Sequence, residues 1–211
     1  MPASSAFFLF GEPLAVDLVN TRARRGATLV DALDSPTALA AWLKKEASHV
    51  AWQGQPTRTD LIAVQALRSA IDTLLRTSLS MPRPAPAALQ TAVDALNNVL
   101  TLPILRPRLR WTPSGPRVMP PGADARRAVL LNALAMSAVT VLTGPDAARL
   151  RECAHPDCVL LFVARNARRR WCSATTCGNR ARVARHYHQQ RSQQGERSST
   201  RAKAGTQGSG D

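Results

Sequence analysis

The chain has 211 residues, and its content of 45% hydrophobic and 4% aromatic residues allows one packed domain with a core of Leu, Val and Ala plus a small module. The formal charge is +14 and is unevenly distributed, since residues 149–203 contain 12 arginines and one lysine against three acidic side chains. Such a concentration of positive charge is typical of a polyanion binder, or of a basic tail that keeps a protein soluble. Because the longest apolar stretch, residues 128–142, is shorter than the roughly 20 residues of a membrane span, the sequence predicts no membrane segment.

The N-terminal residues predict short elements. Residues 7–10 are hydrophobic and predict a short strand, and no basic region precedes them, so we expect no export signal and a cytoplasmic protein. Leu14 and Leu18 lie four residues apart and indicate a short amphipathic helix over residues 13–25. Residues 28–33 then predict a second brief strand or a turn.

Three helices are predicted next. Ser35 and Pro36 mark the start of one that reaches about Ser48, because serine is a preferred N-cap and proline suits the first helical position. Its buried residues should be Leu39, Trp42 and Leu43. Residues 58–80 have apolar side chains at spacings of three and four, which indicates a helix with a polar outer face. That outer face should contain Arg68, Asp72 and Arg76. A further helix is expected over residues 86–100.

Residues 101–122 are rich in proline and predict an irregular hairpin, in which the stretch around Leu109 pairs with residues 117–119. Asp124 then caps a helix that is apolar almost all round and runs through Leu142, as in a central buried helix. Residues 1–148 are therefore expected to form a mostly helical domain with a few short strands. Together with a small finger at the C-terminal end, this domain predicts an α+β fold.

Four cysteines form two Cys-x4-Cys pairs that are separated by thirteen residues. Disulfides are rare in the cytosol, and structural zinc prefers a closed tetrahedron of thiolates. We therefore expect one structural Zn²⁺ per chain, held by Cys153, Cys158, Cys172 and Cys177. Four thiolates leave no open position on the metal, so no catalysis is expected there. The alternatives are two disulfides, four free cysteines without metal, or one sulfur replaced by His155, His186 or His188.

The residues around the cysteines predict a treble-clef-like zinc finger over residues 149–194. Its elements should be a strand over 159–163, a return strand over 168–171 and a helix over 179–194. A module of this size has little core, so the metal must supply much of the folding free energy. The small core should contain Phe162, Trp171 and Val183. Residues 195–211 lack apolar side chains other than alanine and should form a disordered tail.

The string Arg169-Arg170-Trp171-Cys172-Ser173, followed by Cys177-Gly178-Asn179-Arg180, resembles the CGNR zinc finger family. Residues 14–21, LAVDLVNT, resemble the ABATE domain that precedes this finger in bacterial-type proteins described as stress-induced transcription regulators. The resemblance implies a DNA-binding finger and an N-terminal α/β domain that senses a ligand. Two residues depart from the family pattern: Ala164 stands where an acidic residue is often found, and Ala174 where a methionine is often found.

Arginines dominate the finger, and their forked donors suit both phosphates and guanine edges. We expect the hairpin arginines to bind phosphates and the helix to face a groove. The predicted nucleic-acid-binding residues are Arg165, Arg168, Arg169, Arg170, Arg180, Arg182, Arg185 and His186. For Asn179 and Arg180 a second interpretation is that they bond carbonyl groups of the knuckle at the start of the helix.

The N-terminal domain gives weaker functional signals. Asp17, Asn20 and Thr21 can line a pocket for a small-molecule effector, or they can satisfy buried backbone groups. The tryptophans Trp42, Trp52 and Trp111 are expected to pack in the core or on the surface rather than to form a ligand cage. No phosphate loop, nucleophile elbow or catalytic triad pattern is present, so we expect no enzyme. The favoured function is a nucleoid-associated DNA-binding transcription regulator that a small-molecule effector can control. The alternatives are an RNA-binding protein and a protein-interaction module.

Overall fold

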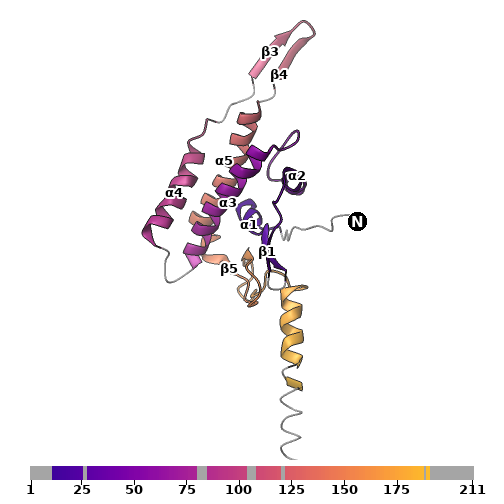
Figure 1. Ribbon diagram of the computed structural model, residues 1–211, viewed down its shortest axis with the longest axis vertical. Coiled ribbons are helices and arrows are strands. Elements are labelled where there is room, and N and C mark those ends of the chain that lie inside the picture. The colour runs from indigo at the N-terminus through magenta and orange to yellow at the C-terminus, as the bar shows by residue number, and fades with distance from the viewer. Residues whose placement is uncertain are drawn as a thin grey trace, which may run out of the picture.

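The computed structural model describes residues 11–25, 28–79, 85–103, 108–119, 122–187 and 189–190. Three long helices, α3 (Arg58–Leu79), α4 (Pro86–Leu100) and α5 (Ala123–Thr143), lie side by side and form the body of the protein (Figure 1). The predicted strand at residues 7–10 and the predicted tail at 195–211 lie outside the described residues. The mostly helical N-terminal part with short strand pairs confirms the α+β class.

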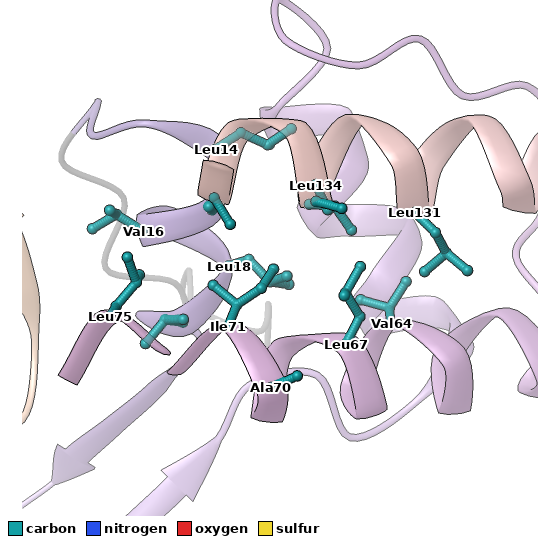
Figure 2. Close-up of a cluster of buried hydrophobic side chains, with 14 of the residues drawn as sticks. Leu14, Val16, Leu18, Val64, Leu67, Ala70, Ile71, Leu75, Leu131 and Leu134 are labelled. Carbon is teal, nitrogen blue, oxygen red and sulfur yellow. The ribbon is translucent and has the colours of Figure 1, made fainter. Parts of the chain in front are cut away.

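The short helix α1 (Leu14–Val19) lies at the centre of this body, against α3 and α5. Figure 2 shows its side chain Leu18 beside Ile71 of α3 and Leu134 of α5, and all three are fully buried. A helix of six residues has too few hydrogen bonds to form alone in water. Burial of its side chains, worth about 1.5–3 kcal/mol for each leucine, therefore stabilises α1.

A two-stranded hairpin follows α1, formed by β1 (Arg22–Arg25) and β2 (Thr28–Asp31) in antiparallel pairing. The sequence predicted a brief strand or a turn over residues 28–33, and β2 is that strand. The helix predicted over 13–25 was wrong in its second half, because that half contains β1. The cause is tertiary: the pairing with β2 and the burial of Ala23 hold these residues extended.

A buried arginine of α3 anchors this hairpin. The guanidinium of Arg68 is 1% exposed and donates to Thr21 Oγ1 at 2.7 Å and to the two carboxylate oxygens of Asp31 at 2.7 and 2.5 Å. The prediction that Arg68 lies on the solvent face was therefore wrong. Burial alone would raise the pKa of Asp31, but the hydrogen bonds and positive charge of Arg68 outweigh it and lower this pKa below the usual value.

The remaining helices agree closely with the sequence. The Ser35 hydroxyl accepts a hydrogen bond from the Ala38 amide at 3.2 Å, which confirms the N-cap of α2 (Pro36–Lys45), although α2 ends earlier than predicted. The predicted bounds of α3 and α4 are confirmed to within one residue. Gly122 rather than Asp124 is the N-cap of α5, and Asp124 instead forms an ion pair with Arg127 in the first turn.

The position of helix α5 accounts for its apolar composition. By length and composition alone, its 20-residue segment Asp124–Thr143 is long and apolar enough to cross a membrane. This segment is longer than the apolar stretch 128–142 from which the sequence predicted no membrane span. It packs against α1, α3 and α4, and the core helix of a protein with no membrane segment has the same properties. The helix is therefore only weak evidence for a membrane span.

The chain forms a second hairpin at one end of the body, from β3 (Arg108–Thr112) and β4 (Gly115–Met119) (Figure 1). This confirms the predicted pairing, with Leu109 opposite Val118. Trp111 is 77% exposed on this hairpin, whereas Trp42 is fully buried in the core. At the other end of the body lies the cysteine-containing region, with the hairpin and this region on opposite ends of the long axis (Figure 1).

The cysteine-containing region begins after a 3-10 turn at Ala147–Arg149. Strand β5 (Leu150–Glu152) pairs antiparallel with β6 (Leu161–Val163), and a helix covers residues 177–187. The strand predicted at 159–163 is therefore confirmed in its second half, but its predicted partner was wrong. Residues 168–171 form no strand: β5 pairs with one edge of β6, and the chain after β6 turns.

Candidate metal centre and basic surface

The four cysteine sulfurs gather beside the start of the C-terminal helix, and all lie within 4.8 Å of one another. The Sγ atoms of Cys158 and Cys172 are 3.8 Å apart, and those of Cys172 and Cys177 are 3.6 Å apart. A tetrahedron with metal–sulfur bonds of about 2.3 Å has edges of about 3.8 Å. All four cysteines are free of disulfides, so the four sulfurs can hold one metal ion.

Local turns bring the sulfurs of each pair together. In the first pair the amide of Cys158 donates to the carbonyl of His155 at 2.9 Å, and His155 Nδ1 accepts from the Asp157 amide at 3.2 Å. The His155 ring therefore serves its own turn and is not one of the clustered ligands. In the second pair the Gly178 amide donates to the Ser173 carbonyl at 2.9 Å, which closes the turn that opens the helix.

Gly178 lies against the ring of Trp171. A Cβ atom at this position would lie 3.2 Å from Trp171 Cδ1 and 3.4 Å from the Ser173 carbonyl oxygen. The contact with Trp171 is tighter than an ordinary van der Waals contact, so an added side chain would require the tryptophan ring to shift by a few tenths of an ångström. Close packing against Trp171 therefore accounts for the glycine of the Cys-Gly-Asn-Arg string.

The cysteines influence the ionisation of one another. Hydrogen bonds from Cys158 and Cys172 lower the pKa of Cys153 to about 2, and the bond to Cys153 raises the pKa of Cys158 to about 12. The hydrogen bond to Cys153 likewise raises the pKa of Cys172, and burial raises that of Cys177. One thiolate at this spacing thus opposes ionisation of the next, and four thiolates together require a cation.

A small apolar core surrounds the sulfurs. Its buried side chains are Leu160, Phe162, Ala164 and Ala23, with Trp171 packed against them. Val183 is 46% exposed, so its predicted place in this core was wrong. Ala23 belongs to β1 of the N-terminal part, and its contribution has no signal in the sequence around the cysteines.

Strand β6 belongs to two cores at once. Successive side chains of a strand point to opposite faces. Leu161 and Val163 therefore belong to the core of the helical body, whereas Leu160 and Phe162 belong to the core around the sulfurs. The body and the metal centre are joined by a shared strand, so neither has a core that is complete without the other.

Polar side chains from the N-terminal part bind the backbone of β6. The carboxamide of Asn20 donates to the Leu161 carbonyl at 2.9 Å and accepts from the Leu161 amide at 2.9 Å. Glu12 accepts from the Val163 amide at 2.8 Å and forms an ion pair with Arg169 at 2.9 Å. Asn20 and Glu12 are buried and take the place of a neighbouring strand.

A third link comes from α3. Arg76 donates to Asp72 at 2.7 Å and to the Val159 carbonyl at 2.7 Å, and it also pairs with Glu152 of β5. The helix periodicity placed Arg76 on an outer face correctly, but it gave no sign that this face meets the cysteine-containing region. These contacts position β5 and β6 relative to α3.

The three predicted effector-binding residues are all buried. Asn20 bonds β6, and the Thr21 hydroxyl donates to the Leu18 carbonyl at 2.6 Å and accepts from Arg68. Both side chains therefore satisfy protein groups, which was the alternative to ligand binding. Asp17 is 1% exposed within α1.

The predicted nucleic-acid-binding residues fall into two groups. Most are exposed around the cysteines, either after β6 or on the helix: Arg165, Arg168, Arg170, Arg180, Arg182, Arg185 and His186. Within the described part of the chain, the side chains of Asn179 and Arg180 form no hydrogen bond to the knuckle, so that interpretation is not supported. The guanidinium of Arg170 lies 5.6 Å from the Trp171 ring.

Arg169 differs from its neighbours, because its guanidinium is used inside the protein. Besides the ion pair with Glu12, it donates to the carbonyls of Cys172 at 2.7 Å and Trp171 at 3.2 Å. It also lies 4.3 Å from the centre of the Phe162 ring. Arg169 thus ties the second cysteine pair to the N-terminal part. The sequence did not predict this structural role, and the role of Arg169 in nucleic-acid binding stays a prediction.

Comparisons with known protein families agree with this architecture. Residues 12–145 match the ABATE family, described as "Putative stress-induced transcription regulator", and residues 149–190 match the CGNR zinc finger. Both are regulator or zinc-finger families rather than enzyme families. No curated protein matches the chain. Since the first match alone covers more than half of the sequence, the chain belongs to the ABATE family and carries a CGNR zinc finger at its C-terminal side.

Proposed function

We propose that this protein is a DNA-binding transcription regulator in which four cysteines hold one structural Zn²⁺ and position a surface of arginines. The observation that carries the proposal is the set of exposed arginines around the sulfurs. Within the described residues, none of these side chains forms an ion pair: Arg165, Arg168, Arg170, Arg180, Arg182 and Arg185. Exposed guanidinium groups without an acidic partner can bind phosphates.

The helix over residues 177–187 is the element best placed to enter a groove. It projects from the body (Figure 1), and a helix of about 10–12 Å in diameter fits a major groove about 12 Å wide. Arg182, Arg185 and His186 are exposed and spaced by three and four residues, so they share one face. We assign this face to base edges and the loop arginines to phosphates.

Residues 1–148 are the proposed regulatory domain and residues 149–194 the proposed DNA-binding unit, with a cytoplasmic location at the nucleoid. Strand β6 supports control of one by the other. A ligand that shifts α1 would move Asn20, and Asn20 binds both backbone groups of Leu161 in β6. The same strand contributes Phe162 to the core around the sulfurs. A change in the body would thus reach the metal centre directly.

Fluorescence anisotropy with duplex DNA, a structured RNA and a polyacidic peptide tests this function. We expect duplex DNA to bind most tightly, with an affinity that falls as salt rises, by about 0.9 logarithmic units per tenfold increase in salt for each phosphate contact. The double variant R182A/R185A should bind weakly. The matched control R110A/R117A removes two exposed arginines from the hairpin at the opposite end and should bind normally. A flat salt dependence contradicts DNA binding, and preference for RNA or peptide favours the alternative functions.

A further inference from the structure

A hollow beside the metal centre is lined by residues from both matched family regions. Arg24 of β1 and Arg180 of the C-terminal helix line it, together with Thr176, Asp157 and three of the four clustered cysteines, Cys158, Cys172 and Cys177. We propose that Arg24 and Arg180 jointly bind one phosphate of the DNA, which makes the ABATE part of the chain a direct component of the nucleic-acid interface. This inference rests on the proposed function and extends it to a residue outside the zinc finger.

The position of Arg24 is well determined by its neighbours. Ala23 packs into the core around the sulfurs, so β1 is held against the cysteine-containing region. Arg68 holds Asp31, the residue paired with Arg22 at the other end of the hairpin, and thereby ties β1 and β2 to α3. Figure 1 shows β1 next to the start of the C-terminal helix. Arg24 is therefore presented from a fixed strand rather than from a loop.

Two arginines of the hollow are available to an anion. Arg24 and Arg180 are both exposed, and within the part of the chain that the structure describes neither has an ion-pair partner. The metal-bound thiolates of Cys158, Cys172 and Cys177 line the same hollow and partly compensate these positive charges, so we expect the phosphate at the solvent-exposed guanidinium groups. The helix that begins at residue 177 adds the partial positive charge of its N-terminus at the same place. Among the described residues, Asp157 is the acidic side chain that lines the hollow, and together with the cysteine thiolates it opposes anion binding.

An alternative role for the two arginines is to compensate the negative charge of a zinc ion bound by four thiolates. The two roles differ in what their removal changes. A phosphate contact affects DNA affinity and its salt dependence, whereas charge compensation affects retention of the metal. Zinc content and DNA affinity must therefore be measured on the same variants.

The test compares R24A and D157N with wild type by anisotropy on one mixed-sequence duplex at several salt concentrations. R24A should weaken binding roughly tenfold at low salt, as expected for one charge-assisted contact, and should reduce the salt slope by about 0.9. D157N should tighten binding, because it removes the opposing charge. R117A, on the hairpin at the far end, is the matched control and should leave both quantities unchanged. All variants should keep one zinc per chain.

Each other outcome has a distinct meaning. Wild-type affinity and salt slope in R24A, with weak binding by R182A/R185A, would overturn the role of Arg24 and leave the proposed function intact. Loss of zinc from R24A would assign the arginine to charge compensation and equally overturn the inference. Absence of salt-dependent binding by the wild-type protein would refute the proposed function itself.

Discussion

Replacing Asn20 with alanine tests whether β6 joins the helical body to the metal centre. The Asn20 side chain is 2% exposed, and it is bonded to the amide and the carbonyl of Leu161, which is fully buried. Alanine leaves both backbone groups of Leu161 in an apolar environment without these partners. Each buried group that loses its hydrogen bond costs about 1–3 kcal/mol, so for two groups we expect a loss of about 2–6 kcal/mol in the free energy of unfolding.

Urea denaturation followed by circular dichroism measures this loss, with Asn98→Ala as the matched control. Asn98 is exposed on α4, and alanine favours the helix, so the control should be as stable as wild type or slightly more stable. N20A should also lose zinc to a chelator faster, because β6 carries part of the core around the sulfurs. A destabilisation below about 1 kcal/mol, or an unchanged rate of zinc loss, would refute the coupling of the two cores through β6.

Three further perturbations follow from the same contacts. Arg68→Leu should lower the free energy of unfolding by about 3–5 kcal/mol in denaturation experiments, because it leaves the Asp31 carboxylate without its buried partner. A change under about 1 kcal/mol would contradict the role of Arg68 as the anchor of the hairpin. Because Arg68 lowers the pKa of Asp31, the contribution of Asp31 to stability is complete above its unfolded pKa of about 3.9 and is lost as pH falls through its lower folded pKa. Thermal melts from pH 7 to 3 should show this loss in wild type and a smaller one in R68L. Gly178→Ala should shift Trp171 fluorescence and cost about 1–3 kcal/mol through overpacking, and an unchanged spectrum would show that the contact is relaxed in solution.

Local sequence signals predicted those elements that local interactions determine. The N-cap at Ser35 and the apolar spacing of α3 and α4 need no information from distant residues, and these helices were predicted closely. The end of α1 depends on the pairing of β1 with β2 and on the burial of Ala23. A sequence pattern over residues 13–25 contains neither contact, so the extended segment was assigned to the helix.

The metal ligands were predictable for a similar reason. Two cysteines with four residues between them can meet through a single turn, so each pair of sulfurs is a local feature. The supports of the site are not local, since Asn20 lies 141 residues before its partner Leu161 and Glu12 lies 151 residues before Val163. Arg169 was assigned to phosphates because its carboxylate partner, Glu12, could not be identified from the residues around it.

The most direct test is elemental analysis of the pure full-length protein, combined with DNA binding before and after removal of the metal. We expect one zinc per chain, bound by the four cysteines, and after chelation we expect loss of DNA affinity together with loss of structure in both cores. The account is contradicted by a preparation without stoichiometric metal, or by a metal-free chain that stays folded and binds DNA as tightly as before.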